Sequence, residues 1–205
     1  MKRGKFIVIE GGEGAGKGAV RKFLESQFPT AIFTREPGGT PLGEKIRAAM
    51  LSPEAAEASA ETQFGLIWAS RLDHVRAKIK PALEAGKSVI SERFDSSTYA
   101  YQVVGQEAPH LKSLFYEFRK LLGSAVPDLY IFLHVDAKVG VERISRNKKK
   151  EEPLDHFEKR SLDFHERVRE GYQEFFKTAP HIIVDANRPL DAVQREVLAI
   201  IKRYL

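Results

Sequence analysis

The stretch that decides the fold is FIVIEGGEGAGK, residues 6–17, in which the apolar run Phe6–Ile9 is followed by Glu10 and a glycine-rich segment that ends at Lys17. It matches the pattern G-x-x-x-x-G-K, placed directly after a predicted strand and before a predicted helix. A bound phosphate chain needs inward-pointing backbone N–H groups, close approach without Cβ atoms and a helix N-terminus behind it. A glycine-rich turn alone could be a tight connection, but a lysine at this offset favours a loop that binds nucleotide phosphates.

Lys17 is expected to supply a cation to the β- and γ-phosphates. The pattern continues with Ser or Thr, whose hydroxyl ligates Mg²⁺, but this chain has Gly18 and Ala19 there. Because Mg²⁺ keeps several waters and uses substrate phosphates as ligands, the missing hydroxyl weakens metal binding without abolishing it. The residues expected to bind the nucleotide phosphates are Gly11, Gly12, Glu13, Gly14, Ala15, Gly16, Lys17, Gly18 and Ala19.

Short apolar runs rich in Val, Ile and Phe alternate with longer segments of helical periodicity. This order is typical of parallel strands joined by crossover helices, so we predict an α/β fold with a five-stranded parallel sheet flanked by helices. Thr40-Pro41 is typical of a helix start, Pro189 is expected to begin the last helix, and a long helix is expected between residues 54 and 85. The predicted strands, expected to be buried on both faces, are Phe6–Ile9, Ala31–Thr34, Ser88–Ser91, Leu129–Val135 and Ile182–Val184.

The composition indicates a single domain over residues 1–205, with 42% hydrophobic and 30% charged residues. The chain has no cysteine, which excludes disulfide scaffolds, thiolate metal sites and cysteine nucleophiles. Its first apolar run is too short for a signal peptide or a membrane span, so we expect a cytoplasmic protein with no membrane partner.

The net charge of +5 does not choose between nucleic acid, an anionic surface and a phosphorylated small molecule as partner. The densest basic run, residues 146–150, is followed at once by Glu151 and Glu152. It is therefore no long polybasic arm. The glycine-rich loop with Lys17, rather than the charge, is the reason to expect small-molecule nucleotides and no nucleic acid as partners.

Five parts of the chain resemble thymidylate kinases in their order and spacing. They are TREPGGTPLGEKIR (34–47), Arg71, SERFDSSTYAYQ (91–102), DHFEKRSLDFHERVREGY (155–172) and VDANR (184–188). The resemblance covers almost the whole chain and implies a P-loop kinase of the nucleoside monophosphate kinase type, which transfers the γ-phosphoryl group of ATP to dTMP with Mg²⁺. It also implies a homodimer and a cis peptide bond between Glu36 and Pro37.

Arginines are expected to hold the phosphate of the acceptor, because a monophosphate kinase must neutralise two polyanions placed end to end. Arg47 and Arg93 are the candidates, and the resemblance lets Arg93 bridge donor and acceptor phosphates. The resemblance also implies that Arg71 hydrogen-bonds to the carbonyl of the base. A surface arginine at a strand end and a solvated helix arginine are the alternatives for Arg93 and Arg71.

Thr98 and Tyr101 are spaced i, i+3 and share a face if their segment is helical. The resemblance gives Thr98 or Ser97 the polar edge of the base, and places Tyr101 against the sugar C2′, where its ring excludes a ribose hydroxyl; a core tyrosine is the alternative. Phe64 and Trp68 are spaced i, i+4, and the position that holds an aromatic residue in the resembled family is Ile67 here, so base stacking either shifts to Trp68 or Phe64 or is weaker. The full set expected around the monophosphate is Glu13, Glu36, Pro37, Arg47, Phe64, Trp68, Arg71, Arg93, Ser97, Thr98, Tyr101 and Gln102.

A second departure from the family lies at Glu92, where these kinases have an aspartate that helps to hold Mg²⁺. Glu92 and Glu13 are the candidate metal ligands. Either the longer Glu92 compensates for the hydroxyl that Gly18 lacks, or metal-dependent catalysis has decayed while nucleotide binding remains. The first alternative is favoured because the phosphate-binding lysine and both arginines are present.

Residues 143–158 resemble the lid that closes over ATP. Because the phosphate loop carries no arginine, transition-state cations are expected from the lid, namely Arg143 and Arg146, with Lys148–Lys150 as weaker candidates. The lid reads Asp155-His156 where the family has Asp-Arg. Asn187 and Arg188 resemble the loop beside the adenine.

The sequence therefore predicts a dTMP kinase with Lys17, Glu92, Arg93, Arg143 and Arg146 as catalytic residues. A deoxynucleoside kinase is an alternative, because Glu92-Arg93 resembles a signature of that group, although the segments at 34–47 and 91–102 argue for a monophosphate acceptor. A nucleotide-binding protein with weakened catalysis is the alternative from another class.

Overall fold

The computed structural model describes residues 2–147 and 154–205. Its strands β1 (Phe6–Glu10), β2 (Ile32–Arg35), β3 (Val89–Glu92), β4 (Leu129–His134) and β5 (His181–Asp185) form one sheet of order β2-β3-β1-β4-β5. All four pairings are parallel, with Ile7 of β1 opposite Ile90 of β3 and Leu129 of β4. The predicted five-stranded parallel sheet is confirmed, and each strand bound lies within one residue of its prediction.

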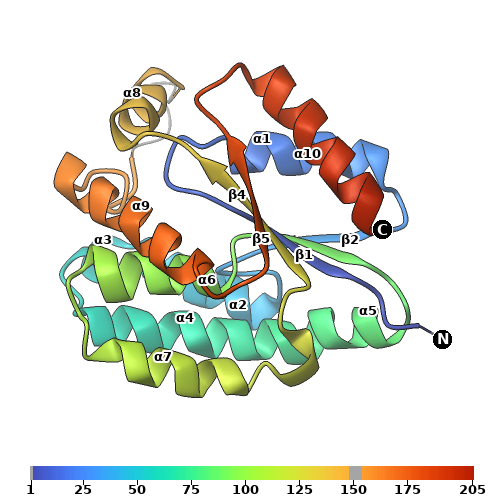
Figure 1. Cartoon of the computed structure of the whole chain (residues 1–205). Helices are drawn as coiled ribbons and strands as arrows, with labels where there is room; N and C mark the ends of the chain where they lie inside the picture. The colour runs from blue at the N-terminus through green and yellow to red at the C-terminus, as the bar shows by residue number, and fades with distance from the viewer. Residues whose placement is uncertain (1, 148–153) are drawn as a thin grey trace.

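Helices cover both faces of the sheet (Figure 1). They are α1 (Lys17–Gln27), α2 (Pro41–Met50), α3 (Pro53–Ala56), α4 (Ala60–His74), α5 (Lys80–Glu84), α6 (Asp95–Thr98), α7 (Leu111–Lys120), α8 (Ala137–Asn147), α9 (Leu162–Phe176) and α10 (Leu190–Tyr204), with π-helical segments Val75–Ile79 and Tyr99–Gly105 and a 3-10 turn Gly123–Ala125. In these described parts of the chain, no helix is long and apolar enough to cross a membrane.

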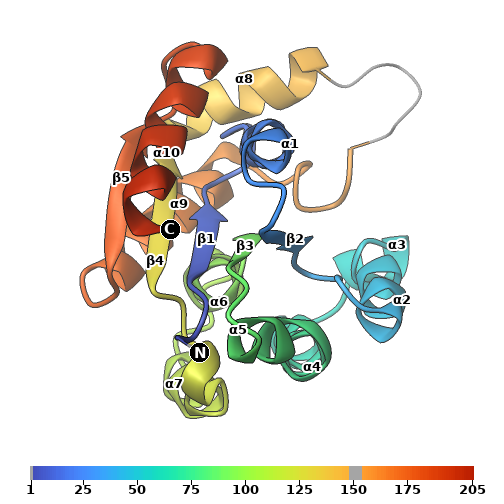
Figure 2. The same ribbon diagram turned by 90° about the vertical axis from the view of Figure 1, so that its right-hand side faces the viewer.

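Alternation along the central strands divides the core into two layers. In β1, Phe6 and Val8 pack with α4, α7 and α9, whereas Ile7 and Ile9 pack with α1 and α10. Figure 2 shows α1 and α10 on one side of the sheet and α4 and α7 on the other. Because successive side chains of a strand point to opposite faces, a strand covered on both sides has no polar alternation, which explains its unbroken apolar run.

Three details differ from the predictions. The helix expected over residues 54–85 is interrupted, because the Ser59 side chain accepts a hydrogen bond from the Thr62 backbone N–H and starts α4 anew at Ala60. Pro189 is the N-cap of α10 rather than its first residue. The edge strand β5 is not buried on both faces, since Ile183 is 56% exposed.

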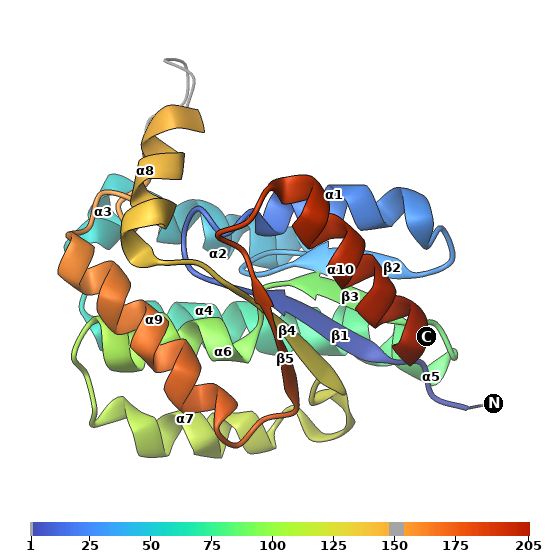
Figure 3. The same ribbon diagram turned by 45° about the horizontal axis from the view of Figure 1, so that its top comes forward.

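The carboxyl ends of the strands place the functional loops at one edge of the sheet, where ligands bind in open parallel sheets. β1 leads into the glycine-rich loop and α1, β3 leads into the segment that begins with Arg93, and β4 leads into α8, which extends away from the sheet (Figure 3).

Candidate active site

The glycine-rich loop closes around the Lys17 ammonium group. Its Nζ donates to the backbone carbonyls of Gly11 at 2.9 Å and Gly12 at 2.7 Å, and the residue is 6% exposed. Burial, together with the nearby Arg93 guanidinium, lowers the pKa of Lys17 to about 8. Gly14 approaches Gly140 of α8 so closely that a Cβ would lie 2.3 Å from the Gly140 carbonyl oxygen, so the loop accepts no side chain there.

Arg93 has a positive φ of 63°, a conformation that is uncommon for a residue other than glycine. Backbone and side-chain bonds hold it there, since the Arg93 N–H donates to the Ile9 carbonyl at 2.9 Å and its carbonyl accepts from the Ser91 hydroxyl at 2.8 Å. The next residue, Phe94, donates its N–H to the Glu10 carboxylate at 2.8 Å. The strained turn directs the guanidinium toward the glycine-rich loop.

Glu10 is a buried carboxylate that gathers donors from the segment after β3. It accepts from the hydroxyls of Ser96 and Ser97 at 2.7 Å each and of Tyr172 at 3.0 Å. Burial raises the pKa of Glu10 above its ordinary value, and these bonds oppose the shift. Sequence analysis did not single out Glu10 or Tyr172, although an acidic residue at the end of a buried strand is an unusual feature that could have drawn attention to Glu10.

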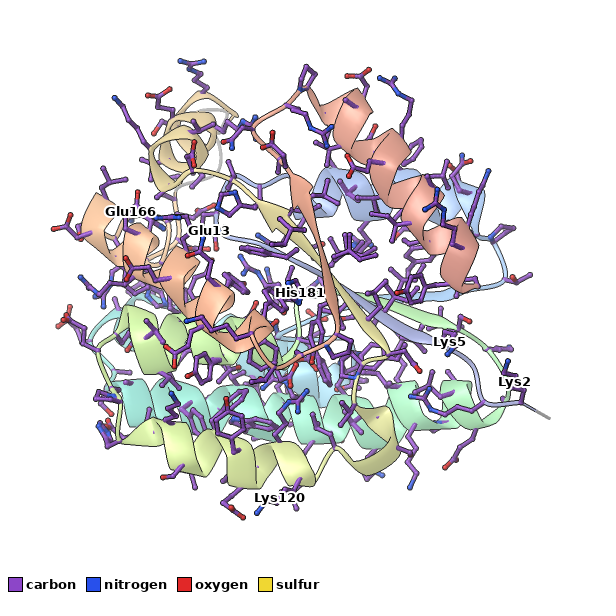
Figure 4. All side chains as sticks on the ribbon, viewed as in Figure 1. Lys2, Lys5, Glu13, Lys120, Glu166 and His181 are labelled. Carbon is purple, nitrogen blue, oxygen red and sulfur yellow. The ribbon has the colours of Figure 1, made fainter. Side chains whose placement is uncertain are left out.

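The Arg93 guanidinium joins the glycine-rich loop to the segment after β3. Its Nη2 donates to Glu13 Oε1 at 2.5 Å, and Tyr101 donates its hydroxyl to the same oxygen at 2.7 Å. Although burial opposes ionisation, Arg93 and Lys17 lower the pKa of Glu13 to about 2, so the carboxylate is charged at neutral pH. In Figure 4 the labelled Glu13 lies toward the end of the molecule that carries α8 and α9, far from Lys2 and Lys5 near the N-terminus.

A cavity of about 350 Å³ opens beside these groups. It is lined by much of the predicted set, which comes together from separate loops and helices, and by apolar and charged residues that were not predicted to lie there. The predicted lining residues are Glu13, Gly14, Gly16, Lys17, Gly18, Ala19, Glu36, Pro37, Arg47, Arg71, Glu92, Arg93, Ser97, Thr98, Tyr101 and Gln102, and the further ones include Arg35, Met50, Leu51, Ile67, Phe94, Asp155, Phe157 and Glu158. Its size suits one small ligand.

Arg71 is fixed at the inner wall of the cavity by a buried hydrogen-bond network. Its Nε donates to Glu36 Oε2 at 2.8 Å, and its Nη2 donates to the Thr98 hydroxyl at 2.9 Å and to the Phe94 carbonyl. The other carboxylate oxygen of Glu36 lies 2.9 Å from His74 Nδ1. The Glu36–Pro37 peptide bond is cis, which confirms that prediction.

Phe64 and Trp68 do not line the cavity, so the prediction that they stack on a base is wrong. Both are buried in the core, where Trp68 packs edge-on against Phe115 and lies beneath the Arg71 guanidinium at 4.6 Å. α4 instead turns Ile67 toward the cavity. The prediction assumed that an aromatic residue must cover the base, whereas aromatic residues at helical spacing serve the core here.

Ser97 and Thr98, the two candidates for contact with the polar edge of the base, make different contacts. Thr98 bonds to Arg71, whereas Ser97 donates to Glu10 and lies 3.4 Å from Arg93 Nη1. Ser97 and Thr98 lie at the end of α6 and Tyr101 and Gln102 lie in the π-helical segment Tyr99–Gly105, and all four line the cavity.

Gly18 and Glu92 lie together on the other side of Lys17. A Cβ built at Gly18 would lie 3.8 Å from both carboxylate oxygens of Glu92 and would meet no other atom within 4 Å. Arg21 of α1 donates from its Nε to Glu92 Oε2 at 3.0 Å and also pairs with Glu25. No group of three His, Asp or Glu side chains in residues 2–147 and 154–205 could hold a metal ion. The fit to Mg²⁺ therefore rests on Glu92 Oε1 with phosphate oxygens and water, a set that magnesium commonly uses.

Arg143 contacts backbone rather than the cavity. Its guanidinium donates to the carbonyls of Gly14 at 3.4 Å, Ala186 at 2.7 Å and Asn187 at 3.0 Å, and so ties α8 to the glycine-rich loop and to the loop after β5. Arg188 is in the same loop and pairs with Glu196. Arg146 does not reach the cavity; its side chain is 77% exposed and lies 3.5 Å from Glu142. Lys148–Lys150 lie outside the described residues.

The base of the predicted lid segment covers the cavity. His156 Nε2 lies 2.8 Å from the Met50 carbonyl at the end of α2, and Phe157 packs edge-on against Tyr101. Asp155 and Glu158 exchange two bonds of 2.9 Å, each carboxylate accepting from the other's backbone N–H. The sequence predicted the segment but not the contact of His156 with α2.

The chain forms a parallel sheet with helices on both faces and a phosphate-binding loop between β1 and α1. These features define a P-loop NTPase fold, and a cation-lined cavity lies beside the loop. The sequence profile of the family described as thymidylate kinase matches residues 9–197. The chain belongs to the thymidylate kinase family.

Individual relatives agree with this assignment. The chain is 37% identical over 204 residues to a thymidylate kinase from Hahella chejuensis, covering 96% of this chain and 95% of the relative, and 40% identical over 199 residues to one from Alkalilimnicola ehrlichii, covering 94% and 90%. The crystal structure of thymidylate kinase from Ehrlichia chaffeensis superposes with a TM-score of 0.73 at 26% identity, covering 98% of this chain and 99% of that one.

Proposed function

We propose that this kinase transfers the γ-phosphoryl group of ATP to dTMP, with ATP on the glycine-rich loop and dTMP in the cavity between Arg71 and Arg93. ATP-dependent phosphorylation of dTMP is the activity that membership of the thymidylate kinase family gives the chain. The alternative of a deoxynucleoside kinase is not favoured.

The observation that carries the substrate proposal is a pair of buried polar atoms that belong to two residues lining the cavity. Within the described residues, Arg71 Nη1 and Gln102 Oε1 are buried and have no hydrogen-bond partner in the protein. One is a donor and the other an acceptor. Thymine offers the complement, a carbonyl acceptor at O4 next to an N3–H donor, whereas cytosine offers an amino donor next to a bare N3 acceptor. A buried polar pair left unmatched costs binding free energy, so the wall favours thymine.

The phosphate groups would meet three cations. Lys17 takes the β- and γ-phosphates of ATP, Arg47 takes the phosphate of dTMP, and Arg93 lies between the two where charge develops during transfer. Because phosphoryl transfer depends on positioning and charge neutralisation, the site needs no covalent nucleophile.

Tyr101 would lie against the sugar and exclude a 2′-hydroxyl, and Glu13 would lie near the sugar and the metal. Glu92 and Glu13 would hold Mg²⁺, which would supply positive charge to offset the negative charge of the phosphates during transfer. Arg143, Asn187 and Arg188 would form the adenine side, and the lid residue Arg146 would approach the ATP phosphates. By resemblance to the family, we propose that the protein acts in the cytoplasm as a homodimer.

The proposal is tested by a coupled assay of ADP release over dTMP, dUMP, dCMP, dGMP and thymidine, each with ATP and with or without Mg²⁺. Turnover of dTMP well above the other substrates, dependent on Mg²⁺, is expected. Turnover of thymidine in place of dTMP would indicate a deoxynucleoside kinase, and nucleotide binding without turnover would indicate the weakened protein.

A further inference from the structure

Gln63 of α4 is buried behind the cavity wall and does not line the cavity. It is 3% exposed, and its Nε2 donates to the Ala55 carbonyl at 2.9 Å and to the Ala58 carbonyl at 3.4 Å. These carbonyls lie in α3 and just after it, so Gln63 ties α4 to the end of α3.

The two carbonyls determine which way the Gln63 amide points. A carbonyl oxygen only accepts hydrogen bonds, so the NH₂ group of Gln63 must face them and its Oε1 must point the other way. That oxygen accepts from the Nε2 of Gln106 at 2.6 Å and the Nε2 of Gln102 at 3.4 Å. Gln102 and Gln106 therefore donate to Gln63, and Gln63 in turn donates to the backbone carbonyls of Ala55 and Ala58.

Gln102 is the amide that continues to the cavity. Gln102 lines the cavity and is 1% exposed, its NH₂ group is turned toward Gln63, and its Oε1 is a buried acceptor with no hydrogen-bond partner among the described residues. If the Gln102 amide were reversed, its oxygen would face the Gln63 oxygen and its NH₂ group would face the ligand. Both contacts would then be mismatched.

We propose that Gln63 is a positioning residue for base selection: it fixes the orientation of the Gln102 amide and so makes the cavity accept a base with a protonated N3. This rests on the proposed function, because it assumes that the base of the monophosphate lies against Gln102. Gln63 acts without touching the nucleotide, and its effect is on the choice of base rather than on phosphoryl transfer.

The experiment compares dTMP with 5-methyl-dCMP, which differ only at the 4-substituent and in protonation of N3. We expect the wild type to prefer dTMP in kcat/KM. Gln63→Met, similar in length but without an acceptor amide, should lower this preference about tenfold, mainly because 5-methyl-dCMP improves, since a freed Gln102 amide can turn its NH₂ group to the bare N3. Gln63→Glu should keep the preference, because a carboxylate still accepts from Gln102.

Two comparisons separate positioning from structural damage. Gln63→Met and Gln63→Glu both remove the donor to Ala55, so both should lower the Tm, while only the first should lower the preference. Gln106→Met removes the other amide that donates to Gln63 Oε1 and should leave the preference for dTMP unchanged. If Gln63→Met does not fold, Gln63→Ala replaces it.

An unchanged preference in a folded Gln63→Met or Gln63→Ala protein would overturn the proposal, as would an equal loss in Gln63→Glu or Gln106→Met. If the wild type phosphorylates neither nucleotide, the proposed function fails separately. The ratio of the two Kd values, measured by calorimetry on the same variants, then decides whether Gln63 sets the preference.

Discussion

The two ends of the site are built in different ways. The inner wall is the side of the cavity around Arg71, and the outer end is the region around Gly18 and Glu92. At the inner wall, Arg71, Glu36 and His74 are buried and joined by hydrogen bonds, so the side chains that meet the base are held before any ligand arrives. At the outer end, Gly18 has no side chain and Glu92 is shared with the partly exposed Arg21. The side chains of the inner wall are held in place by the protein alone, so that two unpartnered polar atoms, Arg71 Nη1 and Gln102 Oε1, are left for the base, whereas the outer end gains its remaining contacts from phosphates, metal and water.

This difference assigns selectivity and catalysis to different kinds of structure. A preorganised wall discriminates because its polar atoms cannot rearrange to suit a wrong base. An outer end that relies on the ligand is more tolerant of sequence change, which accounts for two departures from the family, at positions 18 and 92, lying next to each other.

The sharpest test lies between the two ends, at Lys17 and Arg93. We expect Lys17→Ala and Arg93→Ala each to lower turnover by at least ~10²-fold, because each removes a cation that neutralises phosphoryl charge. Steady-state kinetics of the folded variants would show it, with Arg195→Ala, an exposed arginine on α10, as the control. Near-normal turnover in either variant would contradict the site assignment.

Tyr101 tests whether the inner wall selects by shape as well as by polarity. Tyr101→Ala should lower the preference for dTMP over its ribose counterpart about tenfold in kcat/KM, because the ring no longer excludes the 2′-hydroxyl. Tyr101→Phe retains the ring and loses only the hydroxyl, with its bonds to Glu13 and Arg93, so the preference should persist. If the ratio does not move in Tyr101→Ala, the tyrosine serves the core alone.

The pH dependence of ATP binding tests the phosphate loop. The pKa of Lys17 is lowered to about 8, so the cation is present below pH 8 and is lost as the pH rises through it. Since phosphate binds the protonated form, we expect ATP affinity to fall up to about tenfold between pH 7 and 9. Calorimetry without dTMP would measure this, and Lys17→Arg, which stays charged, should give a flat profile; a flat profile in the wild type would contradict the assignment.

The smallest effect is expected at the outer end, at Gly18. The space beside Gly18 accommodates a side chain, so Gly18→Ser should add a hydroxyl ligand and lower the Mg²⁺ concentration for half-maximal rate about threefold, the gain of one polar contact. Binding of Mn²⁺ to the ATP complex, followed by electron paramagnetic resonance, would measure the same change independently of turnover. An unchanged midpoint would mean that Glu92 already fills this role, and Glu92→Gln would then raise the midpoint more than in relatives with Ser or Thr.

Local patterns sufficed to predict the elements whose identity depends on nearby residues. The strands, the glycine-rich loop and the Thr40 cap follow from burial, close backbone approach and a side-chain acceptor at a helix start. The break before α4 was missed because Ser59 lies in a segment rich in Ala and Glu. The high helix propensity of such a segment favours predicting one continuous helix over a new start at a single capping residue.

Residues of the site could be predicted only where they belong to a sequence motif whose chemical role is known. Arg47, Arg71 and Arg93 could be placed because their segments resemble a family, but Phe64 and Trp68 could not be assigned to cavity or core from spacing alone. A contact between distant segments, such as that of His156 with the Met50 carbonyl, leaves no pattern in one sequence because neither partner is unusual in its own surroundings.

Trp68 is the only tryptophan of the chain, and it lies 4.6 Å below the Arg71 guanidinium. Its ring is buried and its indole nitrogen has no hydrogen-bond partner among the described residues, so its emission is not complicated by solvent or by a second fluorophore of its kind. A cation over an indole face perturbs the electronic state of the ring. Trp68, which does not stack on the base, is therefore an intrinsic fluorescent reporter of Arg71, the residue proposed to contact the base. Its emission can be followed on the time scale of a single turnover without an added label.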